Sequence, residues 1–277
     1  MTTRALIDEA ERKLAAAGVE TPRVDAELLL ANALGVRRAE AVAGLAQKPS
    51  AAQLDDFKQA VARRAAREPL AYISGRQGFR RIELVVDPRV LIPRPETELL
   101  VAVIIVDRPC GILDVATGSG AVALALADEL PDATIVAADI SGGALNVASA
   151  NAERLGLADR VSIVRSDLLD SIAGTFDAIS ANLPYVATGE FAGLPPEIAR
   201  FEPLLALHGG ADGLDLVRRL AQQAPAQLKP GGMLALEIGD TQGAATEDIL
   251  RDAGFTDIEI HQDLTGRDRV VSGRTAR

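Results

Sequence analysis

From Gly111 onward the chain repeats one pattern, in which a short apolar run is followed by a stretch with helical spacing. Five runs have the length of strands: Ile112-Leu113-Asp114-Val115, Thr134 to Ala138, Val161 to Val164, Phe176 to Ala181 and Met233 to Ile238. Strands that alternate with helices are typical of a parallel sheet covered by helices on both faces. The pattern therefore predicts an α/β fold with a doubly wound, Rossmann-like sheet. The last segment, Ile258 to Val271, predicts an antiparallel pair of strands at one edge.

The first part of the chain has a different period. Across residues 1–75 the apolar positions recur with helical spacing, and Ser50 with Gln53 predicts a capping box at the start of one helix. Two strand-like runs follow, Arg80 to Val86 and Val90-Leu91-Ile92, separated by a break at Asp87-Pro88, which indicates a short hairpin or an extended linker. We expect a small helical domain at 1–75, a hairpin linker at 76–98 and the sheet-containing domain at 99–277.

Charge and residue counts limit the functions open to the chain. Of its 277 residues 48% are hydrophobic, which is ample for a buried core. Lys and Arg number 29 against 39 Asp and Glu, a net charge of −10, so a general attraction for nucleic acid backbones is absent. Cys110 is the single cysteine, and His208 and His261 are the only histidines, so we expect no structural metal.

Targeting signals are not evident in the sequence. The first residues carry Asp8, Glu9 and Glu11, which is wrong for a secretory signal. The longest apolar run, Leu99 to Val106, is far shorter than the roughly 20 residues that cross a bilayer. We therefore expect a soluble, cytoplasmic protein that does not bind a membrane.

The first strand of the repeat ends in a turn rich in small residues, Asp114-Val115-Ala116-Thr117-Gly118-Ser119-Gly120. Glycines at a strand-to-helix turn allow close approach of a ligand, and in open parallel sheets that crevice binds ligands. Asp139 ends the next strand, where a carboxylate can accept hydrogen bonds from ribose hydroxyls. Together they predict a nucleoside cofactor; the alternative is a turn that serves only helix packing.

The turn also bears on which cofactor binds. A dinucleotide site usually shows G-x-G-x-x-G, whereas here Ala123 follows Gly118 and Gly120. This difference, with the acidic start at Asp114, favours S-adenosylmethionine over NAD. Asp167-Leu168, after the third strand, are placed to meet the adenine, although Asp167 is nearly as good a candidate for a helix N-cap.

A second group of candidates follows the fourth strand. Asn182-Leu183-Pro184-Tyr185 lies at its carboxyl end, beside the predicted crevice. The Asn182 side-chain oxygen and the Leu183 carbonyl could accept hydrogen bonds from a planar amide or amino group and aim its nitrogen at a methyl donor. Tyr185 could stack on the flat face of that group. The alternative is an ordinary strand-ending turn, since Asn and Pro are common turn residues.

These motifs and several others resemble those of the release-factor glutamine methyltransferase family, the HemK/PrmC type, over nearly the whole chain. The further matches are Val24 to Leu30, Glu68 to Gly75, Val90 to Glu98, Leu236-Glu237-Ile238-Gly239 and Gly266-Arg267-Asp268-Arg269-Val270-Val271. The resemblance implies a class I methyltransferase domain preceded by a helical substrate-recognition domain.

The resemblance also implies a substrate and a set of site residues. The activity would be methylation of the side-chain amide of glutamine in the Gly-Gly-Gln motif of class I peptide-chain release factors, with S-adenosylhomocysteine as product. Residues 116–120, Asp139, Leu168 and Asn182 fall where the family binds S-adenosylmethionine, and Asn182 to Tyr185 where it binds glutamine. Glu96 and Glu98 are candidates for the glutamine entrance.

Two positions depart from the family pattern. The family usually has glycine where this chain has Ala116, so the turn requires a backbone angle that alanine can adopt. The tetrapeptide is usually Asn-Pro-Pro-Tyr, and here its second residue is Leu183. Because this residue is proposed to act through its backbone carbonyl, we expect activity to be retained.

Three other functions remain in view. An adenine amino methyltransferase acting on RNA or DNA is the first alternative, because the Asn-Leu-Pro-Tyr spelling is also found in ribosomal RNA adenine dimethyltransferases. Those enzymes resemble this chain in the catalytic core, but with the domain order reversed and a basic surface. A sister family methylates glutamine in a ribosomal protein, whereas Arg94-Pro95-Glu96-Thr97-Glu98 resembles the release-factor branch. A methyltransferase-like binding module without activity would not need Asn182 or Asp139.

Overall fold

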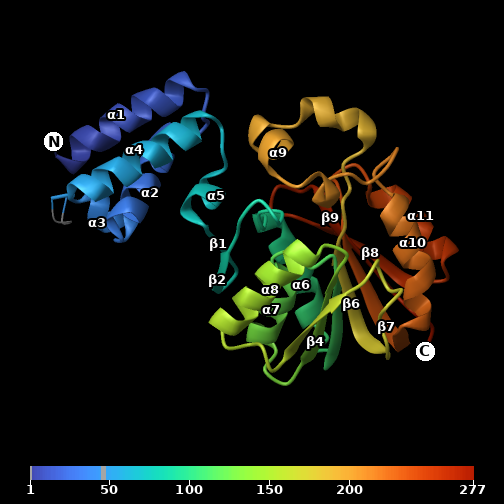
Figure 1. The fold of residues 1–277 in the computed structure, drawn as a ribbon. Helices are drawn as coiled ribbons and strands as arrows, with labels where there is room; N and C mark the ends of the chain where they lie inside the picture. Colours follow the sequence, from blue (N-terminus) through green and yellow to red (C-terminus); the bar gives the residue numbers. More distant parts are fainter. Residues whose placement is uncertain (1, 45–47) are drawn as a thin grey trace. The chain divides into compact units, whose positions relative to one another are not determined.

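A seven-stranded sheet forms the centre of the larger of two compact units in the computed structural model, which describes residues 2–44 and 48–277 (Figure 1). The strand order is β5-β4-β3-β6-β7-β9-β8. The strands are β3 (Gly111–Val115), β4 (Thr134–Asp139), β5 (Val161–Arg165), β6 (Phe176–Asn182), β7 (Leu228–Glu237), β8 (Thr256–Gln262) and β9 (Asp268–Arg274). The first five in this order are parallel, and β9 is antiparallel to both β7 and β8. The predicted α/β class and the antiparallel edge pair are confirmed.

Helices cover both faces of this sheet. Figure 1 shows α6, α7 and α8 on one face and α10 and α11 on the other. Their bounds are α6 (Glu98–Ile105), α7 (Ala121–Glu129), α8 (Gly142–Arg154), α10 (Asp215–Gln223) and α11 (Gly243–Asp252). From β3 the chain moves outward through β4 and β5 and then returns to add β6 on the other side. The strand order therefore reverses between β3 and β6, and at such a point the carboxyl ends of the strands open a crevice.

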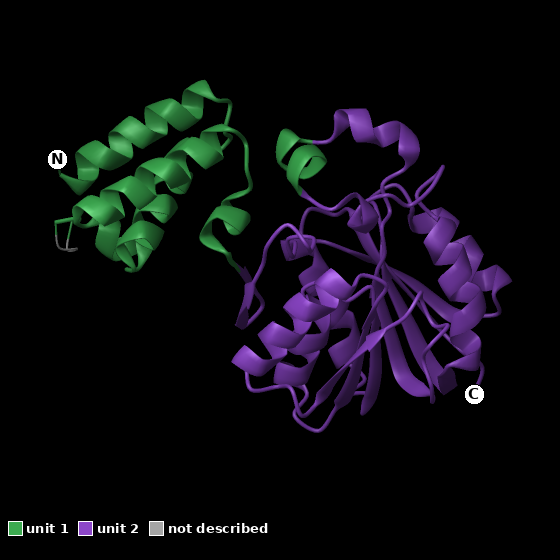
Figure 2. Cartoon of the chain, in the orientation of Figure 1, with its two compact units in different colours: residues 1–76, 195–201 green, residues 77–194, 202–277 purple. Residues whose placement is uncertain are grey.

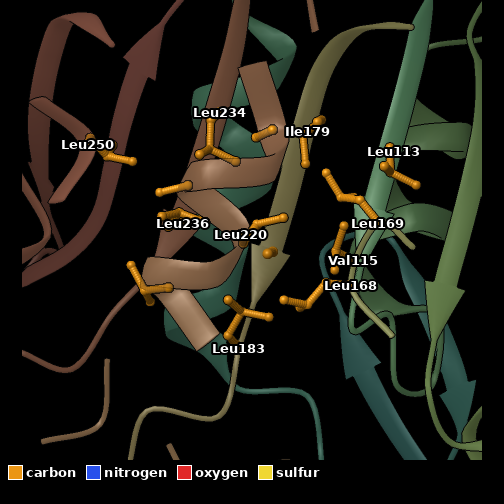
Figure 3. Close-up of a cluster of buried hydrophobic side chains, with 14 of the residues drawn as sticks. Leu113, Val115, Leu168, Leu169, Ile179, Leu183, Leu220, Leu234, Leu236 and Leu250 are labelled. Carbon is orange, nitrogen blue, oxygen red and sulfur yellow. The ribbon is translucent and has the colours of Figure 1, made fainter. Parts of the chain in front are cut away.

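Apolar side chains fill the space between the sheet and the α10 and α11 face. The cluster joins Ile179 of β6 and Leu234 of β7 to Leu220 of α10 and Leu250 of α11, all four fully buried (Figure 3). Leu183, just beyond β6, belongs to the same cluster. The core therefore extends to the carboxyl ends of the strands and supports the residues that follow those ends.

A two-stranded hairpin precedes the sheet, formed by β1 (Arg76–Phe79) and β2 (Ile82–Val85). The sequence predicts strand from Arg80, but Arg80 lies in the turn with a positive φ of 50°. Its backbone N–H donates to the Glu98 carboxylate at 2.9 Å, which stabilises the turn. Residues 86–94 then form a loop, so the predicted Val90-Leu91-Ile92 strand is not present.

The smaller unit is helical (Figure 2). Its described residues are 2–44, 48–76 and 195–201. It contains α1 (Thr3–Ala16), α2 (Pro22–Leu34), α3 (Arg38–Val42), α4 (Ala51–Ala65), α5 (Leu70–Ser74) and α9 (Pro196–Phe201). Ser50 and Gln53 form the predicted capping box, because each side chain bonds to the other's backbone N–H. The apolar faces of α1, α2 and α4 meet in one core through Leu14, Leu30 and Phe57.

The segment 195–201 joins the helical unit through charge. Glu197 of α9 accepts hydrogen bonds from Arg64 at 2.9 Å and from Arg67 at 2.6 Å. Arg64 is itself buried and pairs with the buried Asp25 at 2.7 Å. A short helix far along the sequence is therefore bound to α4 and the turn that follows it. Across residues 2–44 and 48–277, no helix is long and apolar enough to cross a membrane.

Candidate active site

Asp114 anchors the turn that follows β3. Its buried carboxylate accepts hydrogen bonds from the Thr117 hydroxyl at 2.6 Å and from the Ser180 hydroxyl of β6 at 2.8 Å. Burial raises the pKa of Asp114 to about 6, and the two hydroxyl donors oppose that rise. The Asp114 side chain thus connects the turn to the neighbouring strand β6 by hydrogen bonds.

The turn itself depends on left-handed backbone angles. Ala116, Gly118 and Gly120 have φ values of 57°, 58° and 83°. A Cβ atom on Gly120 would lie 2.9 Å from Leu124 Cδ1, so only glycine fits where the turn enters α7. At Ala116 the chain places an alanine in a conformation that costs L-residues roughly 1–2 kcal/mol. The required angle is adopted by alanine, as the sequence led us to expect.

Asp139 lies opposite this turn at the end of β4. Its Oδ2 accepts the Gly118 N–H and its Oδ1 accepts the Ser141 N–H, both at 2.9 Å. Burial raises the pKa of Asp139, while these backbone donors act in the opposite direction. Each carboxylate oxygen has a second lone pair, so both can still accept from the two hydroxyls of a ribose.

One pocket brings the two predicted halves of the site together. It is lined by residues of the β3 turn, the β4 and β5 ends, the β6 end, and loops that include Arg89 to Arg94 and Pro203 to Ala206. Every predicted site residue lines it except Gly120 and Tyr185: Asp114, Ala116, Thr117, Gly118, Ser119, Asp139, Asp167, Leu168, Asn182, Leu183 and Pro184. Thr97 also lines the pocket, whereas its neighbours Glu96 and Glu98 do not.

Asp167 and Leu168 close the pocket on the β5 side. The residues after Asp167 form a turn and not a helix, so the helix-cap alternative is wrong. The Asp167 carboxylate pairs with Arg219 of α10 at 3.1 Å, and Arg219 lines the pocket too. Leu168 is buried with a positive φ of 48°. An apolar side chain beside a charged pair suits a flat base with polar edges.

Asn182 ends β6 at the other side of the same crevice. In the sheet register, Val115 pairs with Ala181, so the residues that follow them, Ala116 and Asn182, leave the sheet at the same level. The Asn182 Nδ2 donates to Thr97 Oγ1 at 3.2 Å. The tetrapeptide Asn182-Leu183-Pro184-Tyr185 therefore begins directly beside the cofactor-type turn.

Leu183 and Tyr185 are held by the protein around them. The Leu183 side chain is buried in the apolar cluster, which gives leucine a packing role at this position (Figure 3). The Tyr185 carbonyl accepts a hydrogen bond from Gln242 Nε2 at 3.0 Å. Burial, followed by the nearby Glu237 carboxyl, raises the pKa of Tyr185 to about 12. Tyr185 is therefore a neutral aromatic group and not a base near neutral pH.

Two further residues at this edge were not among the predicted site residues. Glu237 ends β7 directly opposite Asn182 in the sheet register and is 3% exposed. Thr97 precedes α6 and bonds to Asn182. Burial raises the pKa of Glu237 to about 7. Glu237 could have been identified from the sequence, because it ends a predicted strand. That strand is expected to lie beside the strand that ends at Asn182.

Arg94 lines the pocket together with Thr97 and was not among the predicted site residues either. Its guanidinium pairs with Glu202, whose carboxylate is almost fully buried. The second Glu202 oxygen accepts the Ile92 N–H at 3.4 Å. This pair fixes the loop of residues 86–94 along the pocket wall. The guanidinium lies near Tyr185, where it partly offsets the rise in that pKa.

The two sides of the pocket present different chemical groups. Carboxylates and backbone amides of the β3 and β4 ends suit the hydroxyls of a sugar, whereas Asn182 presents an amide to the pocket, followed by Leu183 and Pro184. No histidine or cysteine lines the pocket among residues 2–44 and 48–277. The site therefore suits a reaction that depends on orientation, without a strong base in the attacking step.

Comparison with known proteins extends these observations. Residues 5–75 match the family model described as PrmC N-terminal domain, and residues 95–193 match the methyltransferase small domain. A release factor glutamine methyltransferase of Moorella thermoacetica is 46% identical, over 97% of this chain and 97% of its own. A second, of Rhodospirillum rubrum, is 41% identical over 97% of this chain and 84% of its own.

Solved structures agree on the fold. The crystal structure of a methyltransferase from Pyrococcus furiosus matches with a TM-score of 0.53 and 18% sequence identity, over 70% of this chain and 89% of that chain. At this identity the match shows that the two chains share a methyltransferase fold.

Proposed function

Because the chain belongs to the release factor glutamine methyltransferase family, we propose that it methylates the side-chain amide nitrogen of the glutamine in the Gly-Gly-Gln motif of class I peptide-chain release factors. The observation that carries this proposal is the position of Asn182-Leu183-Pro184-Tyr185 at the switch point of the sheet, level with the β3 turn. This arrangement supports a holder for a planar amide beside a site for the methyl donor.

The donor in this proposal is S-adenosylmethionine, which supplies an electrophilic methyl group on its sulfonium. Asp139 would accept hydrogen bonds from the ribose hydroxyls, and Leu168 with Asp167 would border the adenine. The turn of residues 116–120 would admit the backbone close to the cofactor, since its left-handed residues are glycines or alanine. These donor and acceptor groups fit a nucleoside with a charged tail.

The glutamine amide would be aimed by Asn182 and Leu183. Its two N–H groups would donate to Asn182 Oδ1 and to the Leu183 carbonyl, so that the nitrogen lone pair points toward the methyl group. During transfer of the methyl group the amide nitrogen would become pyramidal and positive, and both acceptors would then bind it more strongly. Loss of one N–H proton restores a neutral, methylated amide.

Leucine at position 183 is compatible with this role. The proposed acceptor is a backbone carbonyl, which leucine retains, and the buried side chain anchors the tetrapeptide to the core. Tyr185, kept neutral by its raised pKa, would pack on the face of the amide.

We further propose that the helical unit helps to bind the release factor and that the reaction takes place in the cytoplasm. A protein substrate requires contacts beyond a single side chain, and the helical unit corresponds to the family's PrmC N-terminal domain. The net charge of −10 is compatible with a protein substrate and unfavourable for RNA or DNA.

The test is methyl transfer from labelled S-adenosylmethionine to a purified class I release factor. A matched substrate in which the Gly-Gly-Gln glutamine is replaced by glutamate keeps the loop but removes the amide. Label on the first and none on the second supports the proposal. Label on both, or label only on added ribosomal RNA, would contradict it.

A further inference from the structure

Glu237 is an acidic side chain enclosed at the edge of the site. It ends β7 opposite Asn182 and is 3% exposed, and it does not line the pocket. Its Oε2 has no hydrogen-bond partner among the described residues. A buried carboxyl of this kind is costly, because burial removes water without supplying a full set of donors. Its position behind Asn182 therefore requires an explanation.

Hydrogen bonds connect Glu237 to Asn182 in two ways. Asn182 Nδ2 donates to Thr97 Oγ1 at 3.2 Å. The Thr97 hydroxyl and the Asn182 side chain also lie close enough to the Glu237 carboxyl to favour its charged form. One end of the Asn182 amide therefore faces hydrogen-bond acceptors of other residues, and this end is its NH2 group.

The charge of Glu237 is set by the groups that face it. Burial raises its pKa to about 7, Glu96 acts in the same direction, and Arg269 of β9 together with Thr97 and Asn182 lowers it. Tyr185, the remaining titratable neighbour, stays neutral in this range because its own pKa is raised. Glu237 is thus the group beside Asn182 that changes charge near neutral pH, while Asp114, at the end of β3, has a pKa of about 6.

We propose that Glu237 is a positioning residue for methyl transfer: acting through Thr97 and on Asn182 directly, its carboxylate holds the Asn182 amide with Nδ2 toward β7 and Oδ1 toward the substrate. This inference rests on the proposed function, since it assigns the Oδ1 of Asn182 to the glutamine amide. If the Asn182 amide were flipped, its own NH2 group would face the substrate NH2 group. Both groups are hydrogen-bond donors, so they would repel each other.

The carboxylate also polarises the bound amide. Hydrogen bonds in a chain strengthen one another in a low-dielectric interior. A negative charge at the Nδ2 end makes Oδ1 a better acceptor, and the benefit is largest when the substrate nitrogen becomes positive in the transition state. Glu237 should therefore affect kcat more than the KM for the release factor.

Four variants test the assignment: Glu237→Gln, Thr97→Val, Thr97→Ser and, as a control, Glu27→Gln. Glu27 is a buried carboxylate of the helical unit, paired with Arg23 and Arg38. We expect Glu237→Gln to lower kcat about tenfold with little change in KM, and to abolish the rise of kcat with pH as Glu237 ionises. Glu27→Gln should retain that rise.

The Thr97 pair separates hydrogen bonding from packing. Thr97→Val keeps the volume and loses the hydroxyl, so it should lower kcat about tenfold; Thr97→Ser keeps the hydroxyl and should stay within about threefold of the wild type. An unchanged kcat and pH profile in Glu237→Gln, or a Thr97→Ser enzyme as impaired as Thr97→Val, would overturn the assignment. The Thr97 pair also decides the question if Glu237→Gln does not fold.

A readout without turnover distinguishes this inference from the proposed function. The NMR resonances of the Asn182 side-chain amide should shift with pH in the wild type, with a midpoint near the Glu237 pKa of about 7, and should lose this titration in Glu237→Gln. A wild-type enzyme that shows the titration but methylates no release factor would contradict the proposed function alone. An enzyme that methylates the release factor but shows no titration would contradict the role of Glu237 alone.

Discussion

Replacing Glu237 by glutamine removes a buried ionisable group with little change in shape, and the effect on stability should depend on pH. Burial raises the pKa of Glu237 from 4.5 to about 7 in the folded chain. The folded protein therefore keeps a proton that the unfolded chain has lost. The resulting stability is complete below the unfolded value and is lost as pH rises through the folded one.

The size of this loss follows from the two pKa values. At 1.36 kcal/mol for each pH unit between them, the wild-type free energy of unfolding should fall by ~3 kcal/mol relative to Glu237→Gln between about pH 4.5 and about pH 8. Asp114, whose pKa is raised to about 6, titrates in both proteins and cancels in the comparison.

Urea unfolding followed by circular dichroism, at intervals from about pH 5 to about pH 9, measures the difference. Glu27→Gln is the control, because Arg38 and Arg23 outweigh burial and lower the pKa of Glu27, so its titration lies below this range. Parallel stability curves for the wild type and Glu237→Gln across this range would refute the claim that burial raises the pKa of Glu237 to about 7.

Three other substitutions test separate parts of the site. Ala116→Gly should raise the free energy of urea unfolding by about 0.5–1 kcal/mol, because relief at the positive φ exceeds the added entropy of the unfolded chain; a loss of stability would contradict this. Leu183→Ala should lower the same quantity by about 2–5 kcal/mol through a cavity in the core, whereas a change below about 1 kcal/mol would argue against that packing role. Asp139→Asn should weaken S-adenosylmethionine binding at least about tenfold by calorimetry, through loss of charged acceptors for the ribose, and equal affinity would exclude that role.

The fold could be predicted largely because its signals are local. Strand-like runs between Gly111 and Ile238 alternate with helical stretches, except that residues 166–175 between β5 and β6 form turns and no helix, and the runs pair as the parallel sheet expected from that alternation. The Ser50 capping box spans four residues and is present as expected. The observed hairpin has its turn at Arg80, where the sequence predicts a strand. The left-handed turn at Arg80 is stabilised by the distant Glu98, and local propensity does not register this contact.

Within the site, the sequence identified the residues that lie within one turn or tetrapeptide. The β3 turn, Asp139 and Asn182 all end strands, and their meeting at one edge follows from parallel pairing. Glu237 and Thr97 were missed because their role depends on contacts across the sheet with Asn182. The packing of Leu183 into the core likewise depends on α10 and α11, which are distant in sequence.

The grouping of residues 195–201 with the helical unit was not visible either. It depends on the contacts of Glu197 with Arg64 and Arg67, which lie 133 and 130 residues earlier in the sequence. In the sequence the Arg63-Arg64 and Arg67 cluster could contact an acidic partner, but a charged helix face is most often solvated, and no local signal points to Glu197.

The central claim is that Asn182-Leu183-Pro184-Tyr185 presents a glutamine amide to the methyl donor. Tandem mass spectrometry of a class I release factor after incubation with the enzyme and S-adenosylmethionine tests it most directly. The account predicts one added methyl group on the side-chain nitrogen of the Gly-Gly-Gln glutamine, and none after incubation with the Asn182→Ala enzyme. A methyl group on any other residue, or an unmodified glutamine with the active wild-type enzyme, would contradict it.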